Sequence, residues 1–176
     1  MQNAQRLSII LLLCCLSHAA FSQGYLYIGT QRYPSIYVGL FRFPGDVFFR
    51  RNFSAPALSV EVAKRNGGGW LVISTYCQYC DCGFFSRHFA GDVYLYLSDG
   101  SVIKCYDRGL RDCLNDDIIG IYMLSAAEVM RLKQHSIESI RFTIGPPKNV
   151  IGGRRESFIA TSSEDTRQPI RQLFGN

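Results

Sequence analysis

Three closely spaced cysteines and a histidine are the residues whose types and spacing best suit chemistry. Their pattern is Cys-x2-Cys-x-Cys-x5-His, formed by Cys77, Cys80, Cys82 and His88. Three thiolates and one imidazole are a frequent tetrahedral ligand set for zinc. Only one Cys-x2-Cys pair is present, however, and an oxidising compartment would compete for the same thiolates. Zinc binding at these four residues is therefore an alternative hypothesis, and no other cofactor is expected.

The Cys-x2-Cys pair formed by Cys77 and Cys80 also suggests thiol–disulfide exchange. An apolar run at 70–73 leads into the motif, much as a strand leads into the active site of a thioredoxin. A reactive first cysteine needs a helix N-terminus or a similar electropositive site to lower its pKa. Asp81-Cys82-Gly83 follows the motif at once and a strand is expected near Asp92, so no helix is predicted there. Thiol–disulfide exchange is therefore kept as an alternative function only.

No other group of residues forms a catalytic constellation. Once the N-terminal segment described next is removed, His88 and His135 are the histidines of the chain. His135 falls where a helix is expected to end, a position that favours a histidine through the helix dipole alone. The glycines at 67–69 lack the Lys-Ser/Thr continuation of a phosphate-binding loop. The sequence therefore predicts no catalytic residue and favours a non-enzymatic role.

The first 22 residues have the pattern of a signal peptide. One arginine precedes the apolar run 7–16, and Ala20 and Ser22 supply the small side chains that a signal peptidase needs. We expect cleavage after Ser22 and a periplasmic or extracellular mature chain. The apolar run is shorter than the roughly 20 residues of a transmembrane helix, and no later run reaches that length. Leu13 stands where a lipoprotein needs a small residue, so lipidation is not expected.

The cysteines of an exported protein are usually paired in disulfides. Two of the seven cysteines lie in the predicted signal peptide, which leaves Cys77, Cys80, Cys82, Cys105 and Cys113. Because five is an odd number, at least one must be free, paired between chains or bound to a ligand. A bridge between Cys105 and Cys113 would close the short loop between them. This is one of the possible pairings, and the sequence does not choose among them.

The composition predicts one folded domain that is rich in strands. Of 176 residues, 47% are hydrophobic and 19% charged, which excludes a disordered chain. Aromatic residues make up 13%, and together with Val and Ile they favour strands. The length suffices for one domain and is too short for two ordinary ones. The net charge of +5 is modest, so no nucleic-acid partner is expected.

Basic residues gather between Gln31 and Arg65. This stretch holds six basic residues against Asp46 and Glu61, which accounts for the basic excess of the mature chain. The overlapping segment 23–57 is rich in aromatic residues that interleave with arginines. Such interleaving can stack on sugars or bases, but a strand with one buried and one exposed face produces it too, and that interpretation is favoured. The binding candidates are Phe41, Arg42, Phe43, Arg50 and Arg51.

Several short strands are predicted from alternating apolar residues and from turn residues between them. A first hairpin pairs 58–62 with 70–73 across a glycine-rich turn. A second hairpin pairs 92–97 with 102–106, and the Asp-Gly sequence between them favours a type I′ turn. Further strands are expected at 118–124, 139–144 and 157–160.

One short amphipathic helix is predicted at 126–134. Ser125 and Glu128 have the spacing of a capping box, in which each side chain bonds to the backbone of the other residue. Two apolar residues three apart then fall on one face of the helix. After Thr161 the chain is polar and lacks periodicity, so a loosely ordered tail is expected at 162–176, although three apolar residues within it could dock.

The stretch from Asp92 to Ile144 contains a series of short motifs. In chain order they are Ser98-Asp99-Gly100, Ile103-Lys104, Asp107-Arg108-Gly109, Tyr122, Leu132-Lys133 and Ile140-Arg141-Phe142. This series resembles a module of small exported proteins of the Bacteroidota type. The resemblance covers about a third of the chain and brings no catalytic residue with it. It implies bacterial export and a β-rich fold.

Together these patterns predict an α+β domain, mostly antiparallel β-sheet with one short amphipathic helix. The expected organisation is a signal peptide at 1–22, an aromatic-rich segment at 23–57, a β-rich core at 58–161 and a loose tail at 162–176. By elimination, we expect an exported, non-enzymatic binding or structural module of the cell envelope or secretome, with an envelope or glycan partner. The alternative is a thiol–disulfide or zinc-binding protein that uses Cys77, Cys80, Cys82 and His88.

Overall fold

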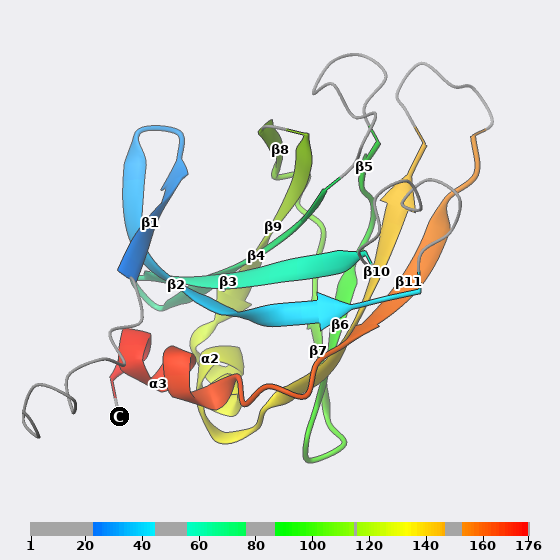
Figure 1. Cartoon of the computed structure of the whole chain (residues 1–176). Coiled ribbons are helices and arrows are strands. Elements are labelled where there is room, and N and C mark those ends of the chain that lie inside the picture. The colour runs from blue at the N-terminus through cyan, green and yellow to red at the C-terminus, as the bar shows by residue number, and fades with distance from the viewer. Residues whose placement is uncertain (1–22, 45–55, 77–86, 115, 147–152, 176) are drawn as a thin grey trace, which may run out of the picture.

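The computed structural model describes residues 23–44, 56–76, 87–114, 116–146 and 153–175. These residues form a curved β-sheet and two helices (Figure 1). The elements are β1 (Gln23–Ile28), β2 (Gln31–Arg42), β3 (Ala57–Arg65), β4 (Gly68–Tyr76), β5 (His88–Phe89), β6 (Val93–Leu97), β7 (Val102–Cys105), β8 (Arg111–Leu114), β9 (Asp117–Ser125), α2 (Ala126–Gln134), β10 (Ile137–Gly145), β11 (Glu156–Thr161) and α3 (Arg167–Phe174). The predicted mostly antiparallel β fold is confirmed.

The described strands form one sheet in which every pair is antiparallel. The order is β7-β6-β10-β11-β2-β3-β4-β9-β8, with β1 added to β2 and β5 added to β10. The sheet is strongly curved, because β5 pairs with β10 and also packs against β9, near the opposite end of this order. Gly120 on β9 permits that approach, since a Cβ there would lie 3.1 Å from the Phe89 ring.

The hydrophobic core lies inside the curve of the sheet. On β10, Ile140, Phe142 and Ile144 are fully buried, as the alternation predicts. Phe142 meets two other rings edge to face, with centroid distances of 5.1 Å to Phe43 and 5.6 Å to Phe89. Each aromatic pair contributes about 0.5–1.5 kcal/mol beyond the area it buries. Phe43 follows β2, Phe89 lies on β5 and Phe142 lies on β10. The cluster therefore joins strands that are distant in the sequence.

Both predicted hairpins, β3–β4 and β6–β7, are present. The β6–β7 loop is not the predicted type I′ turn, which needs a positive φ at both central residues. Gly100 has a φ of 79°, whereas Asp99 is not among the residues with positive φ. The N–H of Gly100 donates to the Leu97 carbonyl, and the N–H of Leu97 donates to the Ser101 carbonyl, both at 2.9 Å. This is the pattern of a type I turn followed by a left-handed glycine.

The helix α2 begins and ends where the sequence predicts. Its capping box is formed: the N–H of Glu128 donates to Ser125 Oγ at 3.3 Å, and the N–H of Ser125 donates to the Glu128 carboxylate at 2.7 Å. At the other end His135 is the C-cap, and its Nε2 lies 3.4 Å from a carboxylate oxygen of Asp99. The helix is therefore tied at its C-terminus to the β6–β7 loop.

The segment 162–176, predicted as a loose tail, contains the second helix, α3. Ile170 is fully buried and Leu173 nearly so, and the helix packs against β2 and α2. Just before the helix, the buried hydroxyl of Thr166 accepts the N–H of Ile137 at 2.8 Å. A helix this short is not stable by propensity, so its order comes from packing that the local sequence does not show. The described residues thus form two helices where the sequence predicted one.

The sheet shows no boundary between the predicted segments 23–57 and 58–161. β2 pairs with β3 from Ser35–Ala63 to Arg42–Ala57, in the middle of the sheet. The C-terminal half of β2, which belongs to the predicted aromatic-rich segment, is therefore part of the core. Its N-terminal half pairs with β1 in a hairpin that projects from the rest of the sheet (Figure 1).

Candidate functional site

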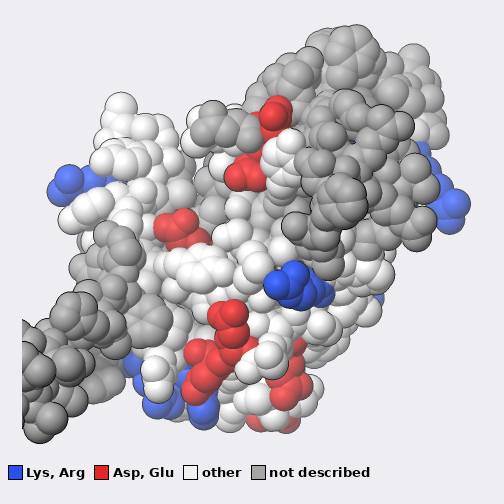
Figure 2. Space-filling view, in the orientation of Figure 1, with Lys and Arg blue, Asp and Glu red and all other residues white. Residues whose placement is uncertain are grey.

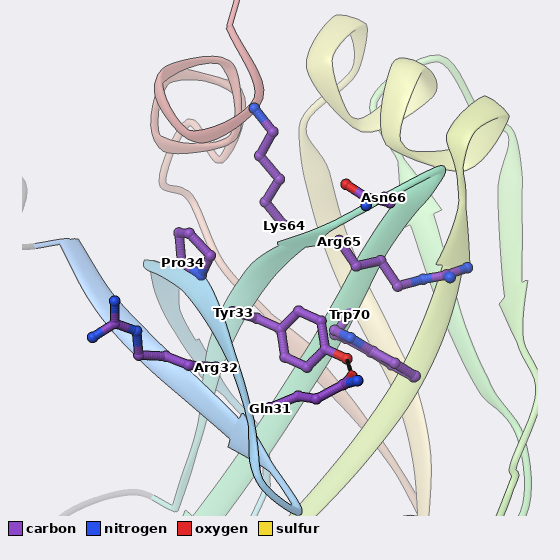
Figure 3. A pocket seen from close by; sticks show the side chains of 8 residues that line it. All are labelled: Gln31, Arg32, Tyr33, Pro34, Lys64, Arg65, Asn66 and Trp70. Atoms are coloured by element: carbon purple, nitrogen blue, oxygen red, sulfur yellow. Dashed lines mark hydrogen bonds between the residues drawn. The ribbon is translucent and has the colours of Figure 1, made fainter.

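A basic and aromatic hollow lies where β2 begins and β3 ends. Its volume is about 440 Å³, and we call it the Trp70 groove (Figure 3). Its wall is formed by residues 31–34, 64–66 and Trp70. The register of the sheet brings these segments together, because Ser35 pairs with Ala63 and Ala63 pairs with Trp70. The small Ala63 side chain leaves room for the larger side chains around it.

Two rings and a guanidinium form the centre of the groove. Tyr33 meets Trp70 edge to face, with centroids 6.0 Å apart and 70° between the planes. The guanidinium carbon of Arg65 lies 5.3 Å from the centre of the Trp70 ring, in a cation–π contact. Trp70 Nε1 and Arg65 Nε are covered and have no hydrogen-bond partner in the described part of the chain. A buried donor without a partner costs about 1–3 kcal/mol, so an acceptor is favoured here.

Three cations surround this centre. Figure 3 shows Arg32 pointing toward β1, Lys64 toward α3 and Arg65 across the indole ring. The guanidinium carbon of Arg32 lies 4.3 Å from the centre of the Tyr25 ring. None of the three forms an ion pair with a described carboxylate, and the groove wall contains no acidic residue. The groove is therefore a site of positive potential that attracts anions.

Acidic side chains lie in a different region. On the face shown in Figure 2 several of them lie below β2, where the chain enters α3. Glu164 lies over β2, since a Cβ on Gly39 would be 3.0 Å from its carboxylate. Beside it, a hydrogen bond from Arg167 lowers the pKa of Asp165 to about 2. The surface is therefore not uniformly basic, and the basic groove is a local feature.

A second hollow, of about 250 Å³, adjoins the groove at Arg65, which lines both. We call it the Lys104 hollow; its wall contains Arg65, Lys104, Tyr106, Arg108, Met123, Ser125 and Glu128. Lys104 Nζ lies 4.7 Å from the centre of the Tyr106 ring and 3.0 Å from an oxygen of Asp92. The Asp92 hydrogen bond raises the pKa of Lys104, which keeps the amine protonated. This hollow is therefore cationic as well.

The turn at 107–109, one of the motifs of the Bacteroidota-type resemblance, has a structural role. The Asp107 carboxylate accepts the N–H of Gly91 at 2.8 Å and the N–H of Gly109 at 2.7 Å. It also pairs with Arg111. These bonds hold the loop that presents the exposed Arg108 to the Lys104 hollow.

The predicted cysteine and histidine cluster is not assembled by the described residues. Cys77, Cys80 and Cys82 lie outside them, so zinc binding and thiol exchange stay predictions. His88 is described; it lies on β5 and pairs with Gly145 of β10. Within the described ranges, no group of three His, Cys, Asp or Glu side chains could hold a metal ion.

A bridge between Cys105 and Cys113, one of the pairings that the sequence left open, is not present. Cys105 is a free thiol at the end of β7, only 1% exposed, whereas Cys113 on β8 is not among the free cysteines. Burial, followed by the charges of Glu128 and Asp92, raises the pKa of Cys105 to about 12. The thiolate is the reactive form of cysteine, so burial in the core disfavours redox chemistry at Cys105 in the folded protein.

The predicted stacking candidates Phe41, on β2, and Phe43, which follows β2, are core residues too. Phe41 is fully buried and Phe43 is 3% exposed, so neither ring is available to a ligand. Arg42 between them is exposed, as expected for a strand with one buried face. Arg50 and Arg51 lie outside the described residues.

The sequence did not single out Tyr33 and Trp70, the rings of the groove. The available signal was the basic stretch between positions 31 and 65, because its two ends meet in the groove. They meet because β2 and β3 are antiparallel, which places Arg32 near Lys64 and Arg65. A charge count along the chain detects the excess, but only strand pairing shows that its ends form one site.

A comparison of this chain with protein families, with curated proteins and with solved structures finds no match. Among the described residues, no helix has the length and apolar character that crossing a membrane requires.

Proposed function

We propose that this protein is an exported, non-enzymatic binding module of the cell envelope or secretome, and that its ligand site is the Trp70 groove. The ligand carries an anionic group on a compact polar scaffold, as the acidic sugars of envelope glycans do. The signal-peptide pattern at 1–22 and the Bacteroidota-type resemblance support export.

The set of cations at the groove carries this proposal. Arg32, Lys64 and Arg65 bring three positive charges to one hollow without an ion pair to a described carboxylate. A bound anion is attracted by all three charges. A carboxylate suits the site, because the planar guanidinium of an arginine can donate two parallel hydrogen bonds to it.

The rest of the wall fits a sugar acid and contains no general base. Tyr33 and Trp70 combine apolar ring surface with polar edges, and the unpartnered indole N–H calls for an oxygen acceptor. Hydroxyl and carboxylate oxygens of a sugar acid supply such acceptors. His88 and His135 are both outside the groove wall. The wall therefore favours binding over hydrolysis.

Calorimetric titration with D-galacturonate and D-galactose, which differ at the carboxylate, tests this function. We expect galacturonate to bind at least about tenfold more tightly, a difference of about 1.4 kcal/mol. Arg65→Gln and the exposed Lys64→Gln should each weaken galacturonate binding, and Trp70→Phe should weaken it by removing the indole N–H donor.

Arg155→Gln is the matched control, because it removes one exposed charge outside both hollows. It should leave the affinity unchanged, and circular dichroism should show that every variant is folded. The proposal would be contradicted if the acid and the neutral sugar bound equally, or if neither bound. It would also be contradicted if folded Arg65→Gln and Lys64→Gln variants kept full affinity for galacturonate.

A further inference from the structure

The Trp70 groove and the Lys104 hollow share one residue, Arg65. It extends from the end of β3 across Trp70 and contributes to both walls. Figure 3 shows its side chain directed away from Arg32 and Lys64, toward β9. The second hollow lies on that side, since Met123 and Ser125 of β9 line it. The two hollows therefore lie on either side of one guanidinium, and we call the pair of hollows the track.

The second half of the track is also suited to an anion. Arg108 is exposed and forms no ion pair with a described carboxylate, while Lys104 is held protonated by Asp92. Glu128 is the acidic residue of this wall, but its carboxylate accepts the N–H of Ser125 at 2.7 Å and the hydroxyl of Ser125 at 2.8 Å. Its oxygens are thus directed to the start of α2, and cations predominate in the hollow.

The sizes of the two hollows favour a chain-shaped ligand. Sites for single small molecules usually measure about 300–1,000 Å³ and enclose most of the ligand. The Lys104 hollow, at about 250 Å³, is smaller than that, and the groove, at about 440 Å³, is near the lower limit. A linear polymer can place one unit in each hollow without being enclosed by either.

We propose that the ligand is a linear anionic glycan that lies across both hollows, with acidic units at the two ends of the track and Arg65 between them. This inference rests on the proposed function and names the ligand class. Contacts in the second hollow are then intramolecular once the first unit is bound, which raises affinity without a new site. A single-stranded nucleic acid fits less well, because it needs exposed ring faces for stacking, and Arg65 covers a face of Trp70.

Titration of the mature protein with galacturonate and with galacturonate oligomers of increasing length tests this ligand class. We expect the dissociation constant per chain to fall by at least about tenfold between the monomer and a short oligomer, and then to level off once the track is filled. Arg108→Gln should abolish this gain while leaving monomer binding unchanged. Arg65→Gln should weaken both, and Arg155→Gln should change neither.

The outcomes separate the two proposals. If the monomer binds and length brings no gain, or if Arg108→Gln keeps the full gain, the glycan track is wrong while the groove function stands. If neither monomer nor oligomer binds, the proposed function itself is wrong. A thymidine oligonucleotide of matched charge that binds more tightly than the galacturonate oligomer would overturn the choice of a glycan.

Discussion

Burial decides what the Cys105 thiol can do. The side chain is enclosed at the end of β7, where desolvation raises its pKa to about 12. In the unfolded chain the same thiol is in water and has its ordinary pKa of 9.0. The folded state therefore keeps a proton that the unfolded state releases above about pH 9, and stability must fall as the pH rises from there.

Substitution of Cys105 by alanine removes this titrating group from both the folded and the unfolded state. Between about pH 9 and pH 12 the wild-type protein should lose up to about 1.4 kcal/mol of unfolding free energy per pH unit relative to Cys105→Ala. Below the unfolded-state pKa the difference between the two proteins should be constant. Urea unfolding near pH 8 and near pH 10 measures it. Parallel pH profiles of the two proteins would show that Cys105 does not carry this effect.

At the scale of elements, α3 shows how a polar segment becomes ordered by packing. It has eight residues, and Ile170 and Leu173 are buried against β2 and α2. The N–H of Ile137 donates to Thr166 at 2.8 Å, and Arg171 Nε donates to the Lys133 carbonyl at 2.6 Å. These contacts join the helix to the sheet and to α2, so α3 is a part of the folded unit.

Truncation of Ile170 tests this role of α3. Ile170→Ala should lower the unfolding free energy by about 2–5 kcal/mol, because it removes a fully buried side chain and leaves a cavity. Gln172→Ala, an exposed position on the same helix, should change it by less than about 0.5 kcal/mol. Urea unfolding of the two variants measures both values. Equal, small losses would mean that α3 is not docked in solution.

At the scale of the whole molecule, strand register suggests where a disulfide forms. Asp117 pairs with Tyr76 at the end of β4 and with Leu114 at the end of β8. Cys113 is therefore close, across the sheet, to the point where the chain continues into the stretch that contains Cys77, Cys80 and Cys82. With Cys105 free, these four cysteines can form two bridges, and we expect one of the three to pair with Cys113.

Thiol counting on the exported protein tests this pattern. We expect no alkylation in the folded state, one reactive thiol after unfolding, and five after reduction. A peptide map without reduction should link the Cys113 peptide to the peptide that contains Cys77, Cys80 and Cys82. The zinc alternative would instead be supported if at least three thiols reacted in the unfolded, unreduced protein. Those thiols should then be protected in the folded protein only while zinc is bound.

Elements with a local cause could be predicted from the order of the residues alone. The β6–β7 hairpin depends on alternation around a turn, α2 depends on a capping box four residues long, and β10 depends on three apolar residues two apart. Each signal is complete within a few neighbouring residues, where propensity, turn chemistry and periodicity act. The prediction of the β6–β7 turn type failed because loop length and register, rather than the Asp-Gly pair alone, decided the backbone.

Features that join distant residues came from the three-dimensional fold. It ordered α3, buried Phe41 and Phe43, left Cys105 free, and brought Arg32 and Arg65 to opposite sides of one ring pair. Such contacts depend on which strands pair, on their register and on the curvature of the sheet. Those are set by the packing of the whole core, and no short window of sequence contains that information.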